Sequence, residues 1–242
     1  MKERPILFSA PMVKAILDGS KKQPRRIVNR VAKIGQVTEF QKSETPGYDW
    51  IMRNSRMLWN DLKHADLLAR CPYGQPGDHL WVREKHQAVH FDYDPETGNS
   101  DDWIQAKPFP KKKTDYYPIV YAADWYKNSN PRYIGSSIDT PEERGFSWRP
   151  SIHMPRWASR ITLEIVSGRV ERLQEISAKD SISEGLTNSA GGGEWMISTP
   201  KMFCRSADPI TVYRALWEQI NGLGSWEKNP WVWVIEFKRV AA

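Results

Sequence analysis

Hydrophobic and polar residues alternate along two long stretches of this chain. Residues 161–166 and 231–240 place apolar side chains at every second position and are rich in β-branched and aromatic residues. This pattern is typical of a strand with one buried face. The same alternation predicts shorter strands at 80–83, after a turn at Gly77-Asp78, and at 117–124 and 170–173.

Helices are predicted where apolar residues recur at three- or four-residue spacing. Near the N-terminus, Pro11 suits the first turn of a helix of one to two turns, and Gly19 can end it in a left-handed conformation. A second, amphipathic helix is predicted over residues 56–70 from the spacing of four apolar residues, Leu58, Leu62, Ala65 and Leu68.

Two later helices have clear starting signals. Ser177 can cap a short helix that Gly185 stops. Asp208-Pro209 opens the last helix. Its core-facing residues are expected to be Val212, Leu216 and Ile220.

The segment from about residue 85 to residue 145 differs from the rest of the chain. It is polar and rich in proline, and it contains the run Lys111-Lys112-Lys113, which is expected to be a solvated face. We expect an inserted surface excursion within a single domain of residues 1–242. Many short strands with irregular connections favour an α+β fold, a mostly antiparallel β-barrel decorated by short helices.

Composition gives a modest preference for polyanionic partners. The 242 residues include 35 Lys and Arg against 29 Asp and Glu, and the net charge is +6. This balance favours contact with nucleic acid without requiring it. The twelve tryptophans and nine tyrosines can stack on bases as well as fill a core.

The sequence predicts a soluble, cytoplasmic protein with no membrane partner. The N-terminus lacks an apolar run of signal-peptide length, and no eighteen apolar residues stand together. Cys71 and Cys204 lack the spacing of a metal site and indicate two reduced thiols.

Common catalytic motifs are missing from the sequence. No HExxH, GxGxxG, GxxxxGK[ST] or nucleophile-elbow pattern is present. His86 and His90 lie four residues apart, but in a segment expected to run from strand into loop. Neither a metal site nor a cofactor is predicted.

Four stretches together carry a resemblance to a known family. They are Ile16-Leu-Asp-Gly-Ser-Lys-Lys-Gln-Pro-Arg-Arg26, Gly77-Asp-His-Leu-Trp-Val-Arg-Glu84, Ile182-Ser-Glu-Gly185 and Trp231-Val-Trp-Val-Ile-Glu-Phe237. In order and spacing they resemble the ASCH domain, a relative of the PUA domain, in the longer form found in phage and prophage genomes. The resemblance implies a PUA-like barrel whose cleft accepts a nucleoside or an RNA end.

Some small ASCH proteins are similar to amidohydrolases that remove the acyl group from N(4)-acetylcytidine with a Lys, a Thr and a Glu. The resemblance places the Lys at Lys21 and the Glu at Glu184, whereas Pro24 stands where the Thr is expected. If that Thr is the nucleophile, this protein must use another hydroxyl, such as Ser20, or lack the activity. If it only orients water, Lys21 and Glu184 suffice.

The residue types fit such a reaction. The loop 20–26 crowds several cations, and like charges in a partly dry cleft lower the pKa of a lysine. Lys21 could then accept a proton near neutral pH while Glu184 holds or relays it. Either Arg26 or the backbone N–H groups after Gly19 could stabilise the oxyanion.

Substrate contacts are expected from a second set of residues. Trp81 and Trp148 could each stack on a pyrimidine ring, although a core position is as good an interpretation for either. Arg83 and Glu84 could bind the substrate, or they could pair with each other or with the loop's cations.

Two functions are therefore predicted. The first is a metal-independent amidohydrolase acting on N(4)-acylated cytosine nucleosides. The second is a non-catalytic module that binds RNA or modified bases through the same basic cleft. Without the resemblance, Lys21 is expected to be a solvated loop cation and Glu184 a carboxylate on a helix surface. A ribonuclease that uses the histidines is a third, less favoured interpretation.

Overall fold

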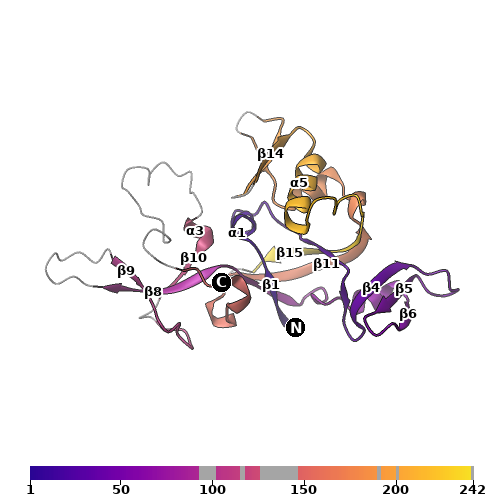
Figure 1. Ribbon diagram of the computed structural model, residues 1–242, viewed down its shortest axis with the longest axis horizontal. Helices are drawn as coiled ribbons and strands as arrows, with labels where there is room; N and C mark the ends of the chain where they lie inside the picture. The colour runs from indigo at the N-terminus through magenta and orange to yellow at the C-terminus, as the bar shows by residue number, and fades with distance from the viewer. Residues whose placement is uncertain (93–101, 115–117, 126–146, 190–191, 200–201, 241–242) are drawn as a thin grey trace. The chain divides into compact units, whose positions relative to one another are not determined.

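The computed structural model describes residues 1–92, 102–114, 118–125, 147–189, 192–199 and 202–240 (Figure 1). These residues form an α+β, strand-rich structure with fifteen strands and five α-helices. The strands make four open sheets, so the expected closed barrel is not formed by the part of the chain that is described. The largest sheet has the order β1-β7-β11-β15-β2. Its edges β1 and β2 do not pair with each other, and a barrel requires that pairing.

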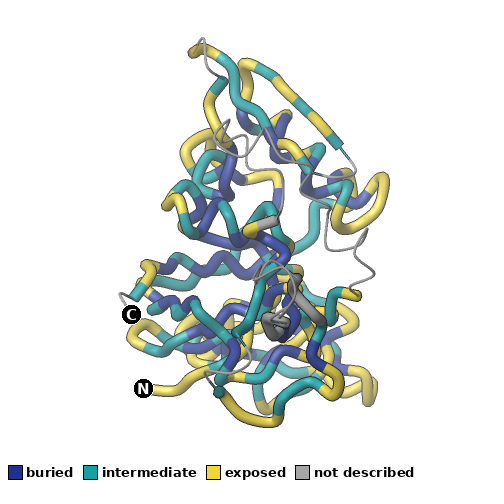
Figure 2. Tube along the Cα trace, turned by 90° about the vertical axis from the view of Figure 1, so that its left-hand side faces the viewer, coloured by how far each residue is buried: buried dark blue, intermediate teal, exposed yellow. Residues whose placement is uncertain are grey.

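The chain forms two compact units. The first contains residues 1–4, 15–80 and 162–241, and the second contains residues 5–14, 81–161 and 242. Three elements run along the chain from one unit into the other, namely β1 (Glu3–Leu7), α1 (Ala10–Leu17) and β7 (His79–Arg83). Each unit has buried residues of its own, which are dark blue in Figure 2.

Two long antiparallel strands are central to the first unit. They are β11 (Thr162–Arg172) and β15 (Trp231–Arg239), and β2 (Arg25–Ile27) pairs with the other side of β15. Both long strands were predicted, and β11 includes the stretch expected to continue the sheet. The four successive residues 232–235 are all buried. Since neighbouring residues of a strand point to opposite faces, both faces of β15 are covered rather than one.

The two helices of the first unit that have clear caps begin where they were predicted to begin. In α4 (Ala178–Ser183), the Ser177 hydroxyl accepts the Asp180 N–H at 3.1 Å. In α5 (Pro209–Asn221), the Asp208 carboxylate caps the first turn. Ile220 is 53% exposed, so its expected core position is wrong, because the buried stripe of α5 ends one turn earlier.

A hairpin that the sequence analysis did not predict packs against α5 (Figure 1). It consists of β13 (Trp195–Thr199) and β14 (Met202–Ser206), with the two-residue β12 (Thr187–Asn188) beside β13.

A four-stranded antiparallel sheet occupies the early part of the first unit (Figure 1). Its strands are β3 (Arg30–Val31), β4 (Gly35–Lys42), β5 (Trp50–Asn54) and β6 (Trp59–Leu62). The helix expected over 56–70 is therefore wrong in its first half, and α2 covers only His64–Ala69. The reason is a turn in which the Asn54 carboxamide accepts the N–H groups of Arg56 and Leu58, so that the chain returns as a strand.

The second unit contains a three-stranded sheet with the order β10-β8-β9. Its strands are β8 (His86–Asp92), β9 (Asp102–Gln105) and β10 (Ile119–Tyr121). The polar segment expected to be a surface excursion thus includes regular structure, and residues 86–89 are buried. Residues 126–146 of that segment lie outside the described residues.

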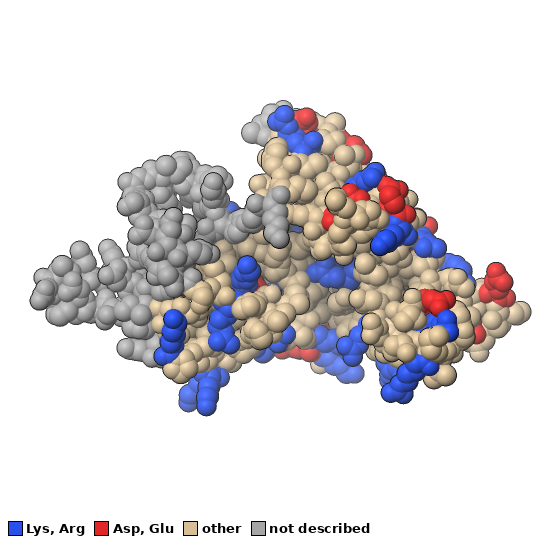
Figure 3. Space-filling model, viewed as in Figure 1, with Lys and Arg blue, Asp and Glu red and all other residues tan. Residues whose placement is uncertain are grey.

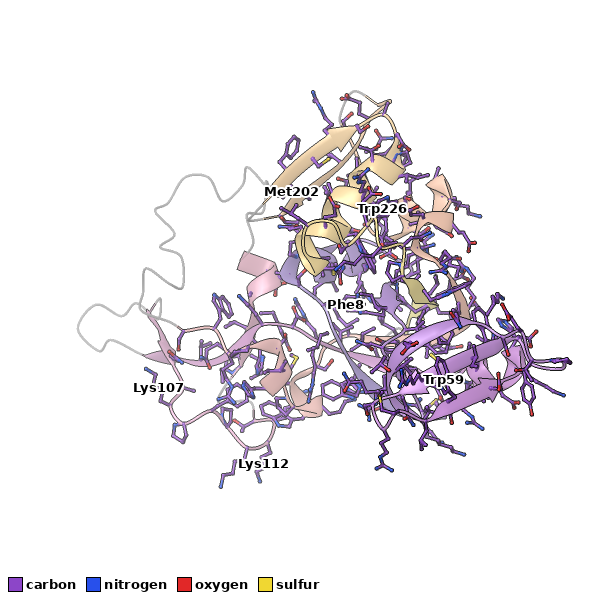
Figure 4. All side chains as sticks on the ribbon, turned by 45° about the vertical axis from the view of Figure 1, so that its right-hand side comes forward. Phe8, Trp59, Lys107, Lys112, Met202 and Trp226 are labelled. Atoms are coloured by element: carbon purple, nitrogen blue, oxygen red, sulfur yellow. The ribbon has the colours of Figure 1, made fainter. Side chains whose placement is uncertain are left out.

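The remaining elements of the second unit are short. The strand predicted at 117–124 is β10 followed by helix α3 (Ala122–Trp125), and two 3-10 turns follow, η2 (Ser151–His153) and η3 (Arg156–Ala158). The lysine run at 111–113 is exposed as expected, and Lys112 points away from the ribbon in Figure 4. In the described ranges, no helix has the length and apolar character needed to cross a membrane.

Candidate active site

Lys21 and Glu184 meet inside the first unit, although 163 residues separate them. Gly19 has a φ of 82°, which ends α1 and turns the chain back. The Lys21 N–H then donates to the Ala15 carbonyl at 2.8 Å, and Lys21 pairs with Glu184 in an isolated antiparallel bridge. Residues directly opposite each other in such a bridge have neighbouring side chains.

The two side chains form a buried ion pair. Lys21 Nζ donates to Glu184 Oε2 at 2.7 Å and to the Glu184 carbonyl at 2.8 Å. The side chain of Lys21 is 0% exposed and that of Glu184 is 4% exposed, so the alternative of a solvated loop cation and a surface carboxylate is wrong. Burial lowers the pKa of Lys21, Glu184 offsets part of this effect, and the charges of Arg26 and Arg25 lower it further.

Arg25 connects Glu184 to two more carboxylates. Its fully buried guanidinium lies 3.2 Å from Glu184 Oε1 and 3.0 Å from Asp180 Oδ2, and it also binds Glu171. Burial alone lowers the pKa of Arg25, but the carboxylates, Glu184 first, outweigh burial and raise it. Arg169 extends the network by binding Glu171 at 2.8 Å and Asp180 at 2.7 Å.

Tyr213 on α5 also belongs to this site. It is 3% exposed, and its ring centroid lies 5.9 Å from Arg25 Cζ. Burial and the nearby Glu184 raise the pKa of Tyr213 well above its usual value, so its hydroxyl keeps its proton.

Three other residues of the loop, Ser20, Pro24 and Arg26, make contacts of different kinds. The Ser20 hydroxyl hydrogen-bonds to Asp18 Oδ1 at 2.6 Å and to the Ala15 carbonyl at 3.2 Å, both at the end of α1. Arg26 is half-buried and donates to the Arg25 carbonyl at 3.3 Å. Pro24 is buried, and its carbonyl accepts a hydrogen bond from the strand β15.

The other predicted site residues belong to the second unit. Trp81 is 8% exposed, and Arg83 Cζ lies 4.7 Å from its ring centroid. Glu84 is bound at both oxygens by Arg160, at 3.0 Å and 3.1 Å, so the suggested Arg83–Glu84 pair is wrong. Trp148 is half-buried.

Burial raises the pKa of Glu84, and Arg160 offsets part of that shift. Lys21, Glu184, Ser20 and Arg26 therefore lie together in the first unit, while Trp81, Arg83, Glu84 and Trp148 lie in the second.

The structure also locates the two thiols. Cys71 is buried and Cys204 is half-buried, and both are free thiols. Burial raises the pKa of Cys71. Across the ranges that the structure describes, no group of three or more His, Cys, Asp or Glu side chains is placed to hold a metal ion.

Sequence analysis did not identify Arg25, Glu171, Asp180 or Tyr213 as site residues. Arg25 is one of several cations in the loop 20–26, and no pattern in the sequence distinguishes it from the others. A weak signal was available on β11, where Arg169 and Glu171 are two residues apart and therefore share a face.

Comparison of the chain with protein-family models, with curated proteins and with solved structures found no match.

Proposed function

We propose that this protein is a metal-independent amidohydrolase that removes the acyl group from N(4)-acylated cytosine nucleosides. The observation that supports the proposal is the 2.7 Å contact between Lys21 Nζ and Glu184 Oε2 in a buried setting that lowers the pKa of the lysine. A lysine with a lowered pKa is more often neutral, and a neutral amine can accept a proton. The choice of substrate comes from the resemblance of the sequence to the ASCH domain.

In the proposed reaction, the neutral Lys21 amine takes a proton from water while the water oxygen attacks the acyl carbonyl carbon. The carbonyl oxygen becomes an oxyanion, for which Arg26 is the candidate donor. Glu184 stabilises the Lys21 ammonium. The tetrahedral intermediate then loses the cytosine N4 nitrogen, which takes the proton back from Lys21, and the products are a carboxylic acid and the free nucleoside.

Water is the nucleophile that this arrangement favours over Ser20. The Ser20 hydroxyl is 2.6 Å from Asp18 Oδ1, and its other contact is the Ala15 carbonyl. Ala15 lies in the last turn of α1, and Asp18 directly follows the helix.

The test is the conversion of N(4)-acetylcytidine to cytidine, followed by ultraviolet absorbance. We expect Lys21→Met to reduce kcat by about 10²- to 10⁴-fold, the usual contribution of a general base. Lys22→Ala is the matched control, because Lys22 is the adjacent lysine and is exposed. If the wild-type protein does not turn over this substrate, or if both variants lose activity equally, the proposal is wrong.

A second variant pair tests the proline that stands where the family has a threonine. Pro24→Thr supplies a hydroxyl, and Pro24→Val supplies the same shape without it. If a hydroxyl at this position is the better nucleophile, Pro24→Thr is faster than Pro24→Val. Equal rates of turnover in the two variants would indicate that water attacks in both.

One observation favours a second candidate, the binding of RNA or modified bases without catalysis. Lys21 Nζ is fully buried and already donates two hydrogen bonds to Glu184, which suits a structural pair. On the face in Figure 3, Lys and Arg side chains are spread more widely than Asp and Glu over the described residues. A binding module would show oligoribonucleotide affinity that falls steeply with salt, whereas an enzyme for free nucleosides would not.

A further inference from the structure

Two neighbouring side chains of the second unit, those of His86 and Arg149, each have a buried nitrogen without a hydrogen-bond partner. The His86 side chain is completely buried, and its backbone exchanges two hydrogen bonds with Arg149, at 3.3 Å and 2.9 Å. Residues that exchange both hydrogen bonds in an antiparallel pair are directly opposite, and their side chains lie on the same face. Both side chains contact Phe109, whose ring centroid is 5.3 Å from the His86 ring and 4.3 Å from Arg149 Cζ.

The backbone fixes the tautomer of His86. Its Nδ1 is 3.1 Å from the Glu84 carbonyl, which can only accept a hydrogen bond, so Nδ1 carries the proton. In the neutral ring, Nε2 then has a bare lone pair. Nε2 is buried and has no hydrogen-bond partner, an arrangement that is rare because a buried polar atom is costly when unsatisfied.

The ring stays neutral at the pH of an ordinary binding assay. Burial lowers the pKa of His86, and the charges of Arg149 and His153 lower it further, although the hydrogen bond to Glu84 opposes them. His86 Nε2 is therefore an acceptor that requires a donor.

Arg149 adds a positive charge that no described carboxylate neutralises. It forms no ion pair with a described residue, and its Nε is buried without a hydrogen-bond partner. Glu84, the closest carboxylate along the chain to His86, is bound at both oxygens by Arg160. The face thus presents a hydrogen-bond acceptor beside a guanidinium.

We propose that His86 and Arg149 form a binding site for a phosphate group that carries or adjoins a hydroxyl. Arg149 would donate charge-assisted hydrogen bonds to the phosphate oxygens, and the hydroxyl would donate to His86 Nε2. Two sources share this chemistry, namely hydrogen phosphate with its own P–OH group and a ribonucleotide with a 2′-hydroxyl beside a 3′-phosphate. Phe109, Arg149 and Trp157 are half-buried, so rotation of these side chains would admit the ligand.

Calorimetric titration of the whole protein at pH 7.5 and constant ionic strength tests the proposal with four probes. Sulfate resembles hydrogen phosphate in shape but has no proton, and we expect phosphate to bind about tenfold more tightly, since an unmade hydrogen bond to a buried acceptor costs about that factor. Cytidine 3′-monophosphate and 2′-deoxycytidine 3′-monophosphate form the second pair. Tighter binding of the hydroxyl-bearing probe in either pair supports the proposal and identifies the source of the hydroxyl. If the two probes bind equally in the first pair and also in the second, the proposal is overturned.

Variants assign the two roles. Arg149→Gln should weaken binding of every probe by about tenfold or more, because it removes the charge. Lys112→Gln, an exposed cation of the same unit, is the control and should bind as the wild type does. His86→Phe should bind sulfate normally and lose the preference for phosphate. Unchanged phosphate binding by Arg149→Gln would overturn the proposal.

Because His86→Phe replaces a buried residue, a measurement on the wild-type protein accompanies it. The nitrogen-15 spectrum of His86 should show Nε2 without a proton, and its shift should change with phosphate but not with sulfate. A protonated Nε2 in the free protein, or equal responses to the two anions, would contradict the assignment.

Discussion

Replacement of Glu184 by glutamine measures how much the buried ion pair stabilises the first unit. The substitution keeps the size of the side chain and the backbone carbonyl that accepts from Lys21 Nζ at 2.8 Å. It removes the negative charge that lies 2.7 Å from Nζ and 3.2 Å from Arg25 Nη1. Lys21 is fully buried, so solvent does not replace this charge.

The structure sets the expected size of the effect. Loss of one partner of a buried ion pair costs roughly 3–5 kcal/mol. Two features favour the lower end, about 3 kcal/mol: the pKa of Lys21 is already lowered, so the amine can lose its proton, and Arg25 keeps Glu171 and Asp180. By contrast, Glu236 is 42% exposed in its pair with Arg169, and Glu236→Gln should cost about 0.2–1 kcal/mol.

Urea unfolding of both variants at several pH values is the assay. The folded-state pKa of Lys21 lies below its unfolded value of 10.5, so the unfolded state binds more protons between the two and stability rises with pH in that window. Glu184→Gln lowers the folded pKa further. The difference in the free energy of unfolding between wild type and Glu184→Gln should therefore become smaller as the pH rises toward 10.5. A difference that stays constant, or a cost no larger than that of Glu236→Gln, would refute the reasoning.

Four further substitutions, of which Gly222→Ala is a control, test local features of the first unit by the same unfolding measurement. Gly185→Ala should lower the free energy of unfolding by about 2–4 kcal/mol, because Gly185 has a φ of 103° and an added Cβ would lie 2.9 Å from Ala15 Cβ. Gly222 has a φ of 95° but open space around it, so Gly222→Ala should lower the free energy of unfolding by only about 1–2 kcal/mol. Equal losses in the two variants would contradict the close approach at Gly185. Burial raises the pKa of Asp78, but hydrogen bonds from neighbouring residues lower it to about 2, so the stability it adds above about pH 4 is lost as the pH falls toward 2. Asp78→Asn should reduce this loss of stability at acid pH. If the free energy of unfolding of the variant falls with pH as steeply as that of the wild type, Asp78 is not the cause. Asp208→Ala should lower the free energy of unfolding by about 1 kcal/mol, because the N-terminal cap of α5 is lost. An unchanged free energy of unfolding would show that the cap does not stabilise the protein.

The features predicted correctly from the sequence are those with local causes. Ser177 and Asp208 signal helix starts because a capping side chain needs only the next two or three N–H groups. Gly19 and Gly185 signal helix ends because the left-handed conformation is a property of one residue. The alternation of 231–240 likewise depends only on the period of a strand.

The features that were missed depend on contacts between distant segments. Leu58 and Leu62 have helical spacing, but the hydrogen bonds that Asn54 makes across a turn direct this part of the chain into a hairpin. The strands β13 and β14 have little sequence signal of their own and lie against α5. In such segments, tertiary pairing outweighs the weak preference of the local sequence.

The candidate site shows the same limit in its chemistry. Lys21 and Glu184 were chosen through a resemblance, but no local rule indicates that Arg25 binds the other oxygen of the same carboxylate. That contact matters for the proposed reaction. Arg25 shares the charge of Glu184 and lowers the pKa of Lys21, so it acts with burial against the stabilising effect of Glu184 on the ammonium. Burial, helped by the charges of Arg26 and Arg25, therefore makes the Lys21 amine easier to deprotonate in spite of Glu184, and a base at this position needs that property.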